Sequence, residues 1–117
     1  MLDLDGMLSI VMPAYNEEKL IYDSIMETLR IVEKFVPELE IVAVNDGSKD
    51  NTKAEIQRAM REDKRVRIVS SEKNRGKGNA IIAGVSQVEG KYVAFVDADL
   101  ELNPSQLEGY LKKMIEQ

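Results

Sequence analysis

Short apolar runs alternate with segments of helical periodicity along this chain, and this alternation limits the folds that it can adopt. Apolar runs too short for helices predict four strands, at residues 8–12, 41–44, 66–69 and 92–96. Segments with helical spacing follow them, at residues 17–36, from about 50, from 76 to 90 and from 103 onward. This order predicts an α/β fold in which a parallel sheet carries helices on both faces, joined by right-handed crossovers.

Proline, glycine and asparagine mark the predicted ends of these elements. Pro13 is expected to end the first strand, because proline cannot donate to a central ladder. Asn16 is expected to cap the first helix, and Gly90 to follow the C-cap of the third. The segment 103–106 has the cap, proline and glutamine pattern of a helix start. Arg67 makes the third strand more polar than the others, so we expect it at an edge of the sheet.

The fourth apolar run, residues 92–96, ends abruptly in Asp97, Asp99 and Glu101. The run is short and rich in β-branched and aromatic residues, which predicts a strand covered on both faces. While the backbone stays extended, the three acids point to one side and Ala98 to the other. Their oxygens could then converge on a hard cation such as Mg²⁺ or Mn²⁺ bridging a diphosphate. The alternative is an acidic turn before the next helix, since turns often recruit aspartate.

Each unusual polar cluster of the chain follows a predicted strand. Carboxyl ends of parallel strands meet at one edge of the sheet, and ligands bind there where the strand order reverses. No G-x-G-x-x-G follows the first strand, which disfavours a dinucleotide site. Lys77 between two glycines lacks the rest of a P-loop, but it can hold an anion at a helix start; a solvated lysine is the alternative. The clusters lie at residues 13–17, 45–48, 74–78 and 97–99.

Composition excludes several classes of function. The 117 residues form one domain of ordinary size, and their net charge of −5 comes with scattered lysines and arginines, which argues against a nucleic-acid surface. Neither cysteine nor histidine is present, which excludes disulfides, typical zinc sites and histidine-based triads. No apolar run approaches the roughly 18 residues of a membrane span, and the acidic start is unlike a signal peptide. We therefore expect a soluble domain.

Four motifs in this chain resemble, in order and spacing, those of the family 2 glycosyltransferases, and within them the dolichyl- or polyprenyl-phosphate sugar synthases. They lie at residues 12–18, 44–52, 74–78 and 96–99, so the resemblance extends over nearly the whole chain from Leu8. It implies a GT-A fold, a Rossmann-like three-layer sandwich with a parallel sheet of order 3-2-1-4. The fourth strand would be an uncovered edge, which favours pairing with another copy of the chain.

The resemblance also implies a nucleotide-sugar site. Its metal ligands would be Asp97, Asp99 and Glu101, the last at a position where the lipid-phosphate synthases commonly have glutamine. Asn45 replaces the aspartate that is usual before Asp46, and capping of its own turn is the alternative role for Asp46. The resemblance assigns no catalytic base. The residues implied to bind the nucleotide sugar are Pro13, Ala14, Tyr15, Glu17, Val44, Asp46, Lys77, Asp97, Ala98 and Asp99.

The leading hypothesis is a glycosyltransferase that uses Mg²⁺ or Mn²⁺ and a UDP- or GDP-sugar, with polyprenyl or dolichyl phosphate as the favoured acceptor. Members of the family normally continue with elements that bind the acceptor. We therefore expect residues 1–117 to be the donor-binding part of a longer enzyme, cytoplasmic or peripheral at the cytoplasmic membrane face, and to transfer little sugar alone. The alternative is a non-catalytic nucleotide-binding module, and whether the gene continues past Gln117 bears directly on the choice.

Overall fold

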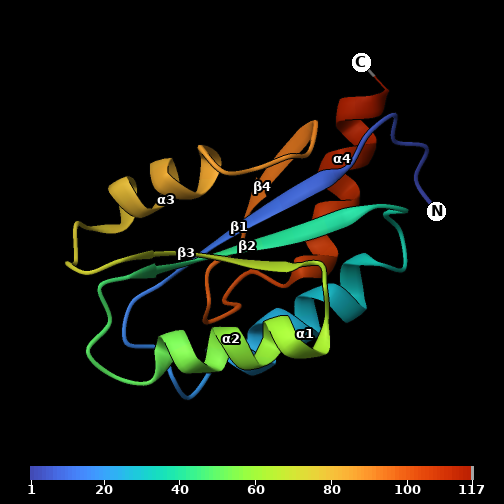
Figure 1. Cartoon of the computed structure of the whole chain (residues 1–117). Helices are drawn as coiled ribbons and strands as arrows, with labels where there is room; N and C mark the ends of the chain where they lie inside the picture. The colour runs from blue at the N-terminus through green and yellow to red at the C-terminus, as the bar shows by residue number, and fades with distance from the viewer. Residues whose placement is uncertain (117) are drawn as a thin grey trace.

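The computed structural model describes residues 1–116, in which strands and helices alternate (Figure 1). The strands form one parallel sheet in the order β3-β2-β1-β4. The predicted α/β fold and its strand order 3-2-1-4 are therefore confirmed. The elements are β1 (Leu8–Ala14), α1 (Ile21–Val32), β2 (Leu39–Asp46), α2 (Thr52–Glu62), β3 (Val66–Ser71), α3 (Lys77–Val85), β4 (Tyr92–Phe95), η1 (Pro104–Gln106) and α4 (Leu107–Ile115).

Helices cover both faces of the sheet (Figure 1). On one face, Ile10 and its neighbours in β1 and β2 pack with apolar residues of α1, α2 and α4 in the main core. On the other face, α3 lies over Val11 and Val44, which contact Ala80. A side chain on Gly84 would place its Cβ only 2.5 Å from Val11 Cγ1, so glycine lets α3 approach β1 closely. Within residues 1–116, no helix combines the length and apolar character needed to cross a membrane.

β4 differs from the strand that its sequence predicts. It pairs with β1 alone, and Tyr92 and Ala94 on its α1 side are partly buried. On the opposite face Val93 and Phe95 remain 39% and 53% exposed, because α3 packs on β1 and β2. The prediction of a strand covered on both faces is therefore wrong, whereas the predicted open edge is confirmed. Self-association through this edge stays a prediction.

Pro13 lies inside β1, opposite Val44 of β2, so the prediction that it ends the strand is wrong. The carbonyl of Val11 points toward β4 and accepts from Val96 N at 3.1 Å. Alternate residues of a strand point the same way, so the N–H that Pro13 lacks would also face the β4 side. β4 has already ended there at Phe95. The missing donor therefore costs no ladder bond, as at an edge strand.

Two predicted helix caps have different outcomes. Asn16 does not cap α1; it has φ 52°, and its side-chain oxygen accepts from Lys49 N at 2.9 Å while its own N–H donates to Ser48 Oγ. A long-range bond between loops thus takes the acceptor that a cap would need. Asn103 does cap its helix, since its side chain accepts from Ser105 N at 2.9 Å, although the first turn is the 3₁₀ segment η1.

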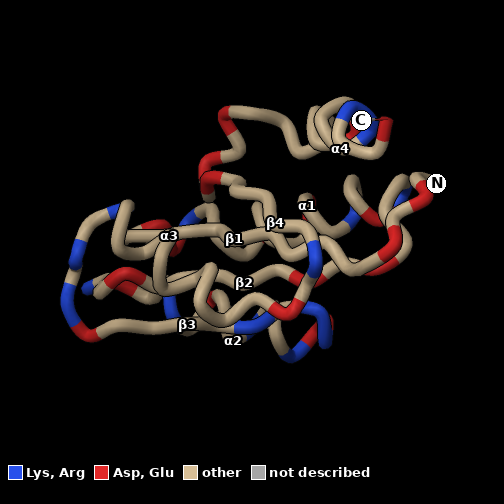
Figure 2. The backbone as a smooth tube through the Cα atoms, turned by 90° about the horizontal axis from the view of Figure 1, so that it is seen from above, with Lys and Arg blue, Asp and Glu red and all other residues tan. Residues whose placement is uncertain are grey.

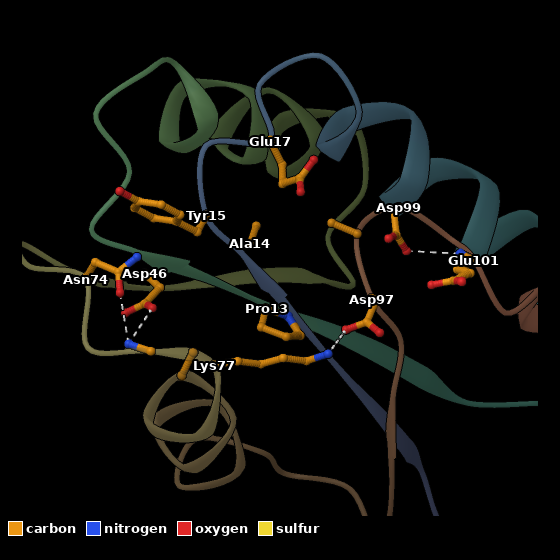
Figure 3. Close-up of a pocket in the computed structure, with 13 residues that line it drawn as sticks. Pro13, Ala14, Tyr15, Glu17, Asp46, Asn74, Lys77, Asp97, Asp99 and Glu101 are labelled. Carbon is orange, nitrogen blue, oxygen red and sulfur yellow. Dashed lines mark hydrogen bonds and ion pairs between the residues drawn. The ribbon is translucent and has the colours of Figure 1, made fainter.

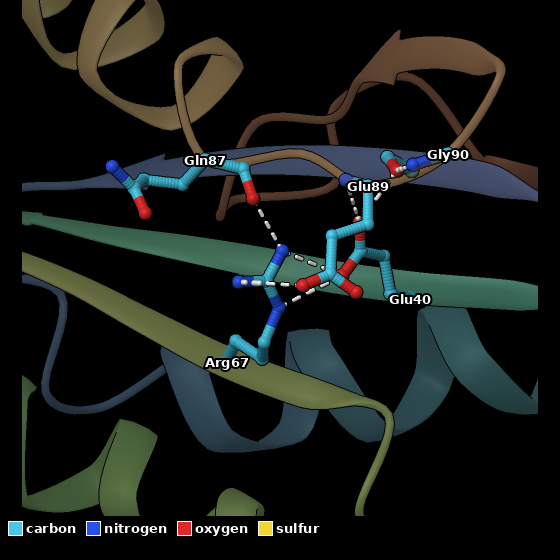
Figure 4. A network of polar contacts seen from close by, with 6 residues as sticks. Glu40, Arg67, Gln87, Glu89 and Gly90 are labelled. Carbon is cyan, nitrogen blue, oxygen red and sulfur yellow. Dashed lines mark hydrogen bonds and ion pairs between the residues drawn. The ribbon is translucent and has the colours of Figure 1, made fainter.

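A buried carboxylate fastens the loop before β4 to the sheet (Figure 4). Glu40 of β2 accepts from Ser9 Oγ at 2.6 Å, from Glu89 N at 2.8 Å and from Arg67 Nε at 2.8 Å. Burial alone raises the pKa of Glu40, but these hydrogen bonds outweigh it and hold the pKa below its usual range. Arg67 lies on β3, which is an edge strand as predicted. The network therefore links three strands to the loop that leads into the acidic segment.

Gly90 belongs to this loop, because α3 ends at Val85. The prediction that Gly90 directly follows the C-cap of this helix is therefore wrong. Its N–H donates to Ser9 Oγ at 2.8 Å, and a Cβ at this position would lie 2.6 Å from Met7 O. Close approach to β1, not a left-handed turn, therefore requires glycine here.

Gly90→Ala should lower the free energy of unfolding by about 1–3 kcal/mol, because the added methyl group overpacks a fixed site. Urea denaturation measures the change. Gly109→Ala is the matched control: nothing lies within 4 Å of its Cβ, and alanine in a helix is favoured by about 0.5–1 kcal/mol. Equal stability of the two variants would contradict the packing role of Gly90.

Candidate functional site

A cavity of about 430 Å³ opens at the carboxyl edge of the sheet (Figure 3). It lies beside the end of β1, between β2 on one side and the segment after β4 on the other. In a sheet of this order the strand order reverses between β1 and β4, which is where ligands bind in open α/β folds. The residues that line it are Pro13, Ala14, Tyr15, Glu17, Asp46, Asn74, Gly76, Lys77, Ala80, Asp97, Ala98, Asp99 and Glu101.

The cavity brings together every predicted site residue except Val44. That residue is 2% exposed beneath α3, where it contacts Val11 and Ala80, so it supports the site from below. Sequence reasoning missed Asn74, Gly76 and Ala80 as lining residues. Asn74 and Gly76 belong to the polar cluster at residues 74–78, which the sequence indicates. The sequence does not indicate that these two residues line the cavity.

Asp46 joins the end of β2 to the loop before α3. It is 4% exposed, and its two oxygens accept from Arg75 N at 3.0 Å and Gly76 N at 3.1 Å. Asn45 serves the local turn instead, since its side-chain oxygen accepts from Ser48 N. Capping of its own turn by Asp46 is therefore not what the structure shows. The carboxylate fixes the backbone directly before Lys77, which begins α3.

Gly47 brings the same two loops into contact. Its φ is +66°, and a Cβ there would collide with the backbone of Lys73 and Asn74, the carbonyl oxygen of Lys73 being 2.8 Å away. Glycine is needed at this position both for the left-handed backbone and for the close approach. The loop before α3 is thus held by packing as well as by Asp46.

The segment that follows β1 is hydrogen-bonded to the loop after β2 and to the first residue of α2. Asn16 N donates to Ser48 Oγ at 2.9 Å, and Glu17 N donates to Thr52 Oγ1 at 2.8 Å. These bonds hold the segment on which Tyr15 and Glu17 stand. Both side chains line the cavity (Figure 3), and Tyr15 is 42% exposed.

Acidic residues gather after β4, in a segment without lysine or arginine (Figure 2). The backbone turns there, since Leu100 N donates to Asp97 O at 3.0 Å and Leu100 has φ 52°. The expectation of an extended backbone through residues 97–101 is therefore wrong. Asp99 accepts from Glu101 N at 3.0 Å within this turn. Ala98 points inward as predicted, is 4% exposed, and its carbonyl accepts from Ser24 Oγ.

Asp97 is paired with Lys77 across the cavity, its Oδ1 lying 2.7 Å from Lys77 Nζ (Figure 3). The hydrogen bond from Lys77 to Asp97 raises the pKa of the lysine, and the charges of Asp99 and Glu101 raise it further. As the side chains lie, no three acids within residues 1–116 converge as a metal-binding group. The donor set still has the chemistry that Mg²⁺ and Mn²⁺ require, since three carboxylates line one end of one cavity. Asp97, Asp99 and Glu101 are the residues of this cavity that could hold such an ion.

Residues 9–117 match the protein family described as "Glycosyl transferase family 2". The chain belongs to glycosyl transferase family 2. It is 36% identical over 111 residues to a dolichyl-phosphate beta-glucosyltransferase, ALG5C, of Trichomonas vaginalis, covering 91% of this chain and 33% of that protein. The chain thus spans about a third of the length of this relative.

Similar solved structures confirm the predicted GT-A fold. The mannosyltransferase PcManGT from Pyrobaculum calidifontis, in complex with GDP-Man and Mn²⁺, superposes with a TM-score of 0.77 at 25% identity, covering 90% of this chain and 31% of that one. S. aureus TarS 1-349 in complex with UDP-GlcNAc superposes with a TM-score of 0.76 at 29% identity, covering 93% and 31% respectively.

Asp46→Ala should free the loop before α3, because the amide of Arg75 loses its acceptor and the amide of Gly76 keeps only the side-chain oxygen of Asn74. A hydrogen bond to a charged acceptor contributes about 1.5–3 kcal/mol, so hydrogen exchange of these amides should accelerate and the unfolding free energy should fall. Exchange monitored by NMR tests this, with Glu72→Ala, an exposed acid before the same loop, as the control. Unchanged protection of both amides in Asp46→Ala would show that the carboxylate does not hold the loop.

Proposed function

We propose that this chain is the donor-binding part of a glycosyltransferase that takes a hexose from a UDP- or GDP-sugar. The observation that carries the proposal is the cavity at the reversal point of the sheet, where Lys77 and three carboxylates lie at one end and Tyr15 and Asp46 line the rest. Membership of family 2 supports it, as do the related structures that hold GDP-Man with Mn²⁺ and UDP-GlcNAc.

The nucleoside would lie toward the ends of β1 and β2. Tyr15 offers an exposed aromatic face there, and Glu17 offers a carboxylate that points into the cavity (Figure 3). Each oxygen of Asp46 already accepts one backbone N–H and keeps a second lone pair that can accept from a base. These three side chains would orient the nucleoside, and Pro13 and Ala14 would form the floor beneath it.

The diphosphate would lie between Lys77 and the segment after β4. Lys77 stands at the N-terminus of α3, where free backbone N–H groups and the helix dipole favour an anion. Asp97, Asp99 and Glu101 would hold Mg²⁺ or Mn²⁺, which neutralises the leaving diphosphate when it is bound. The side chains of this region thus bind and orient the leaving group.

The acceptor that we propose is a polyprenyl or dolichyl phosphate, supported by the dolichyl-phosphate glucosyltransferase among the relatives. A phosphate acceptor is already an anion at neutral pH and needs no strong base, and the cavity offers none beyond the acids assigned above. Transfer itself is proposed for the whole protein, since this chain spans a third of that relative. Holding an acceptor in line is worth ~7–11 kcal/mol, so the isolated chain should transfer little sugar.

UDP or GDP should bind this chain only with Mg²⁺ or Mn²⁺ present, because the acids at the cavity otherwise repel the diphosphate. Asp99→Asn should weaken this binding about tenfold or more, the loss expected for a charged interaction. Calorimetry with and without EDTA measures both effects. Asp3→Asn is the control, because Asp3 is an exposed acid near the N-terminus and does not line the cavity. Equal nucleotide affinity in EDTA and in Mn²⁺ would contradict the proposed site.

A further inference from the structure

Lys77 and Asp97 form an ion pair that bridges the cavity, from the first turn of α3 to the segment after β4 (Figure 3). Both side chains are more than half exposed, at 63% and 51%, so each can rotate without disturbing the core. Their anchors cannot move as freely. Asp46 fixes the backbone before Lys77, and Ser24 holds the carbonyl that follows Asp97. The two side chains can therefore separate while the backbone segments that carry them stay in place.

The charges at this end of the cavity are unbalanced. Three carboxylates, Asp97, Asp99 and Glu101, face one ammonium, which leaves two negative charges uncompensated. Lysine is protonated at neutral pH, so the ion pair with Asp97 is present under ordinary conditions. A bare metal ion that binds Asp97 must therefore displace a cation that is already there.

We infer that Lys77 exchanges partners, holding Asp97 in the empty cavity and moving to the diphosphate when metal and nucleotide bind together. This inference rests on the proposed function and assigns Lys77 a second role beyond contact with phosphate. Exposed ion pairs are weak, so the diphosphate readily replaces Asp97 as the partner of the lysine. The freed Asp97 then joins Asp99 and Glu101 as a metal ligand. Metal and nucleotide thus strengthen each other's binding by the same factor.

Lys77→Gln separates the two roles, because glutamine keeps much of the side-chain length but carries no charge. Binding of Mn²⁺ alone, followed by electron paramagnetic resonance, should tighten about 1.5- to 5-fold, the range for removing an exposed ion pair that competes with the metal. Binding of UDP or GDP at saturating Mn²⁺ should weaken about tenfold or more, because the diphosphate loses a charged partner. The mutual strengthening of metal and nucleotide binding should shrink accordingly.

Two further variants make this test specific. Lys77→Arg keeps the charge and should retain weak binding of Mn²⁺ alone together with most of the nucleotide affinity. Lys73→Gln removes a charge from an exposed residue of the same loop and should leave both affinities unchanged.

Mn²⁺ affinity that is equal or lower in Lys77→Gln than in the unaltered chain would overturn the exchange of partners. This arm needs no nucleotide, so it is read independently of the proposed function. Failure of the unaltered chain to bind UDP or GDP with Mn²⁺ would instead overturn the proposed function.

Discussion

β1 pairs in parallel with β2 on one side and with β4 on the other, and the position of the site depends on this pairing. The register places Ala14 beside Asn45 at the carboxyl end of β2, and Val11 beside Phe95 at the end of β4. Three chain exits therefore meet within one cavity. A slip of one residue would turn Ile10 and Met12 out of the core, so burial holds the register that the site needs.

Long-range hydrogen bonds then fix the loops that follow these strands, and the fixed loops give the cavity its shape. The carboxylate of Asp46 reaches the loop before α3, and Asn16 reaches Lys49 in the loop after β2. Glu40 secures the loop that leads into β4. Each of these bonds ties a loop to a strand or to another loop, so the cavity is organised before any ligand arrives. The contact between Lys77 and Asp97 is different, because both partners are exposed and can separate.

Much of this could be predicted from the sequence, because hydrophobic patterning and strand ends are local properties. The alternation of strands and helices predicts the sheet, and the polar clusters after each strand predict the edge at which the cavity lies. Features that depend on distant residues could not be predicted. Asn16 resembles a cap until Lys49 is placed beside it, and Gly90 resembles a helix end until Met7 is seen against it. Pro13 is tolerated inside β1 only because β4 ends early.

The conformation of the acidic segment at residues 97–101 could not be predicted from the sequence either. Its composition predicts a set of oxygen ligands, but its spacing suggests an extended backbone, whereas Leu100 with positive φ makes a turn. Nothing local to residues 97–101 indicates that Asp97 pairs with Lys77, because the two residues come from opposite sides of β1. Conformation here follows from charges that the fold brings together.

Paramagnetic broadening of backbone amide signals by Mn²⁺ in the presence of UDP or GDP tests the central claim most directly. The proposed site predicts that broadening centres on residues 97–101, extends to residues 76–77 and 13–17, and depends on the nucleotide. Broadening centred elsewhere in the chain, or identical with and without nucleotide, would contradict a nucleotide-diphosphate and metal site at this edge of the sheet.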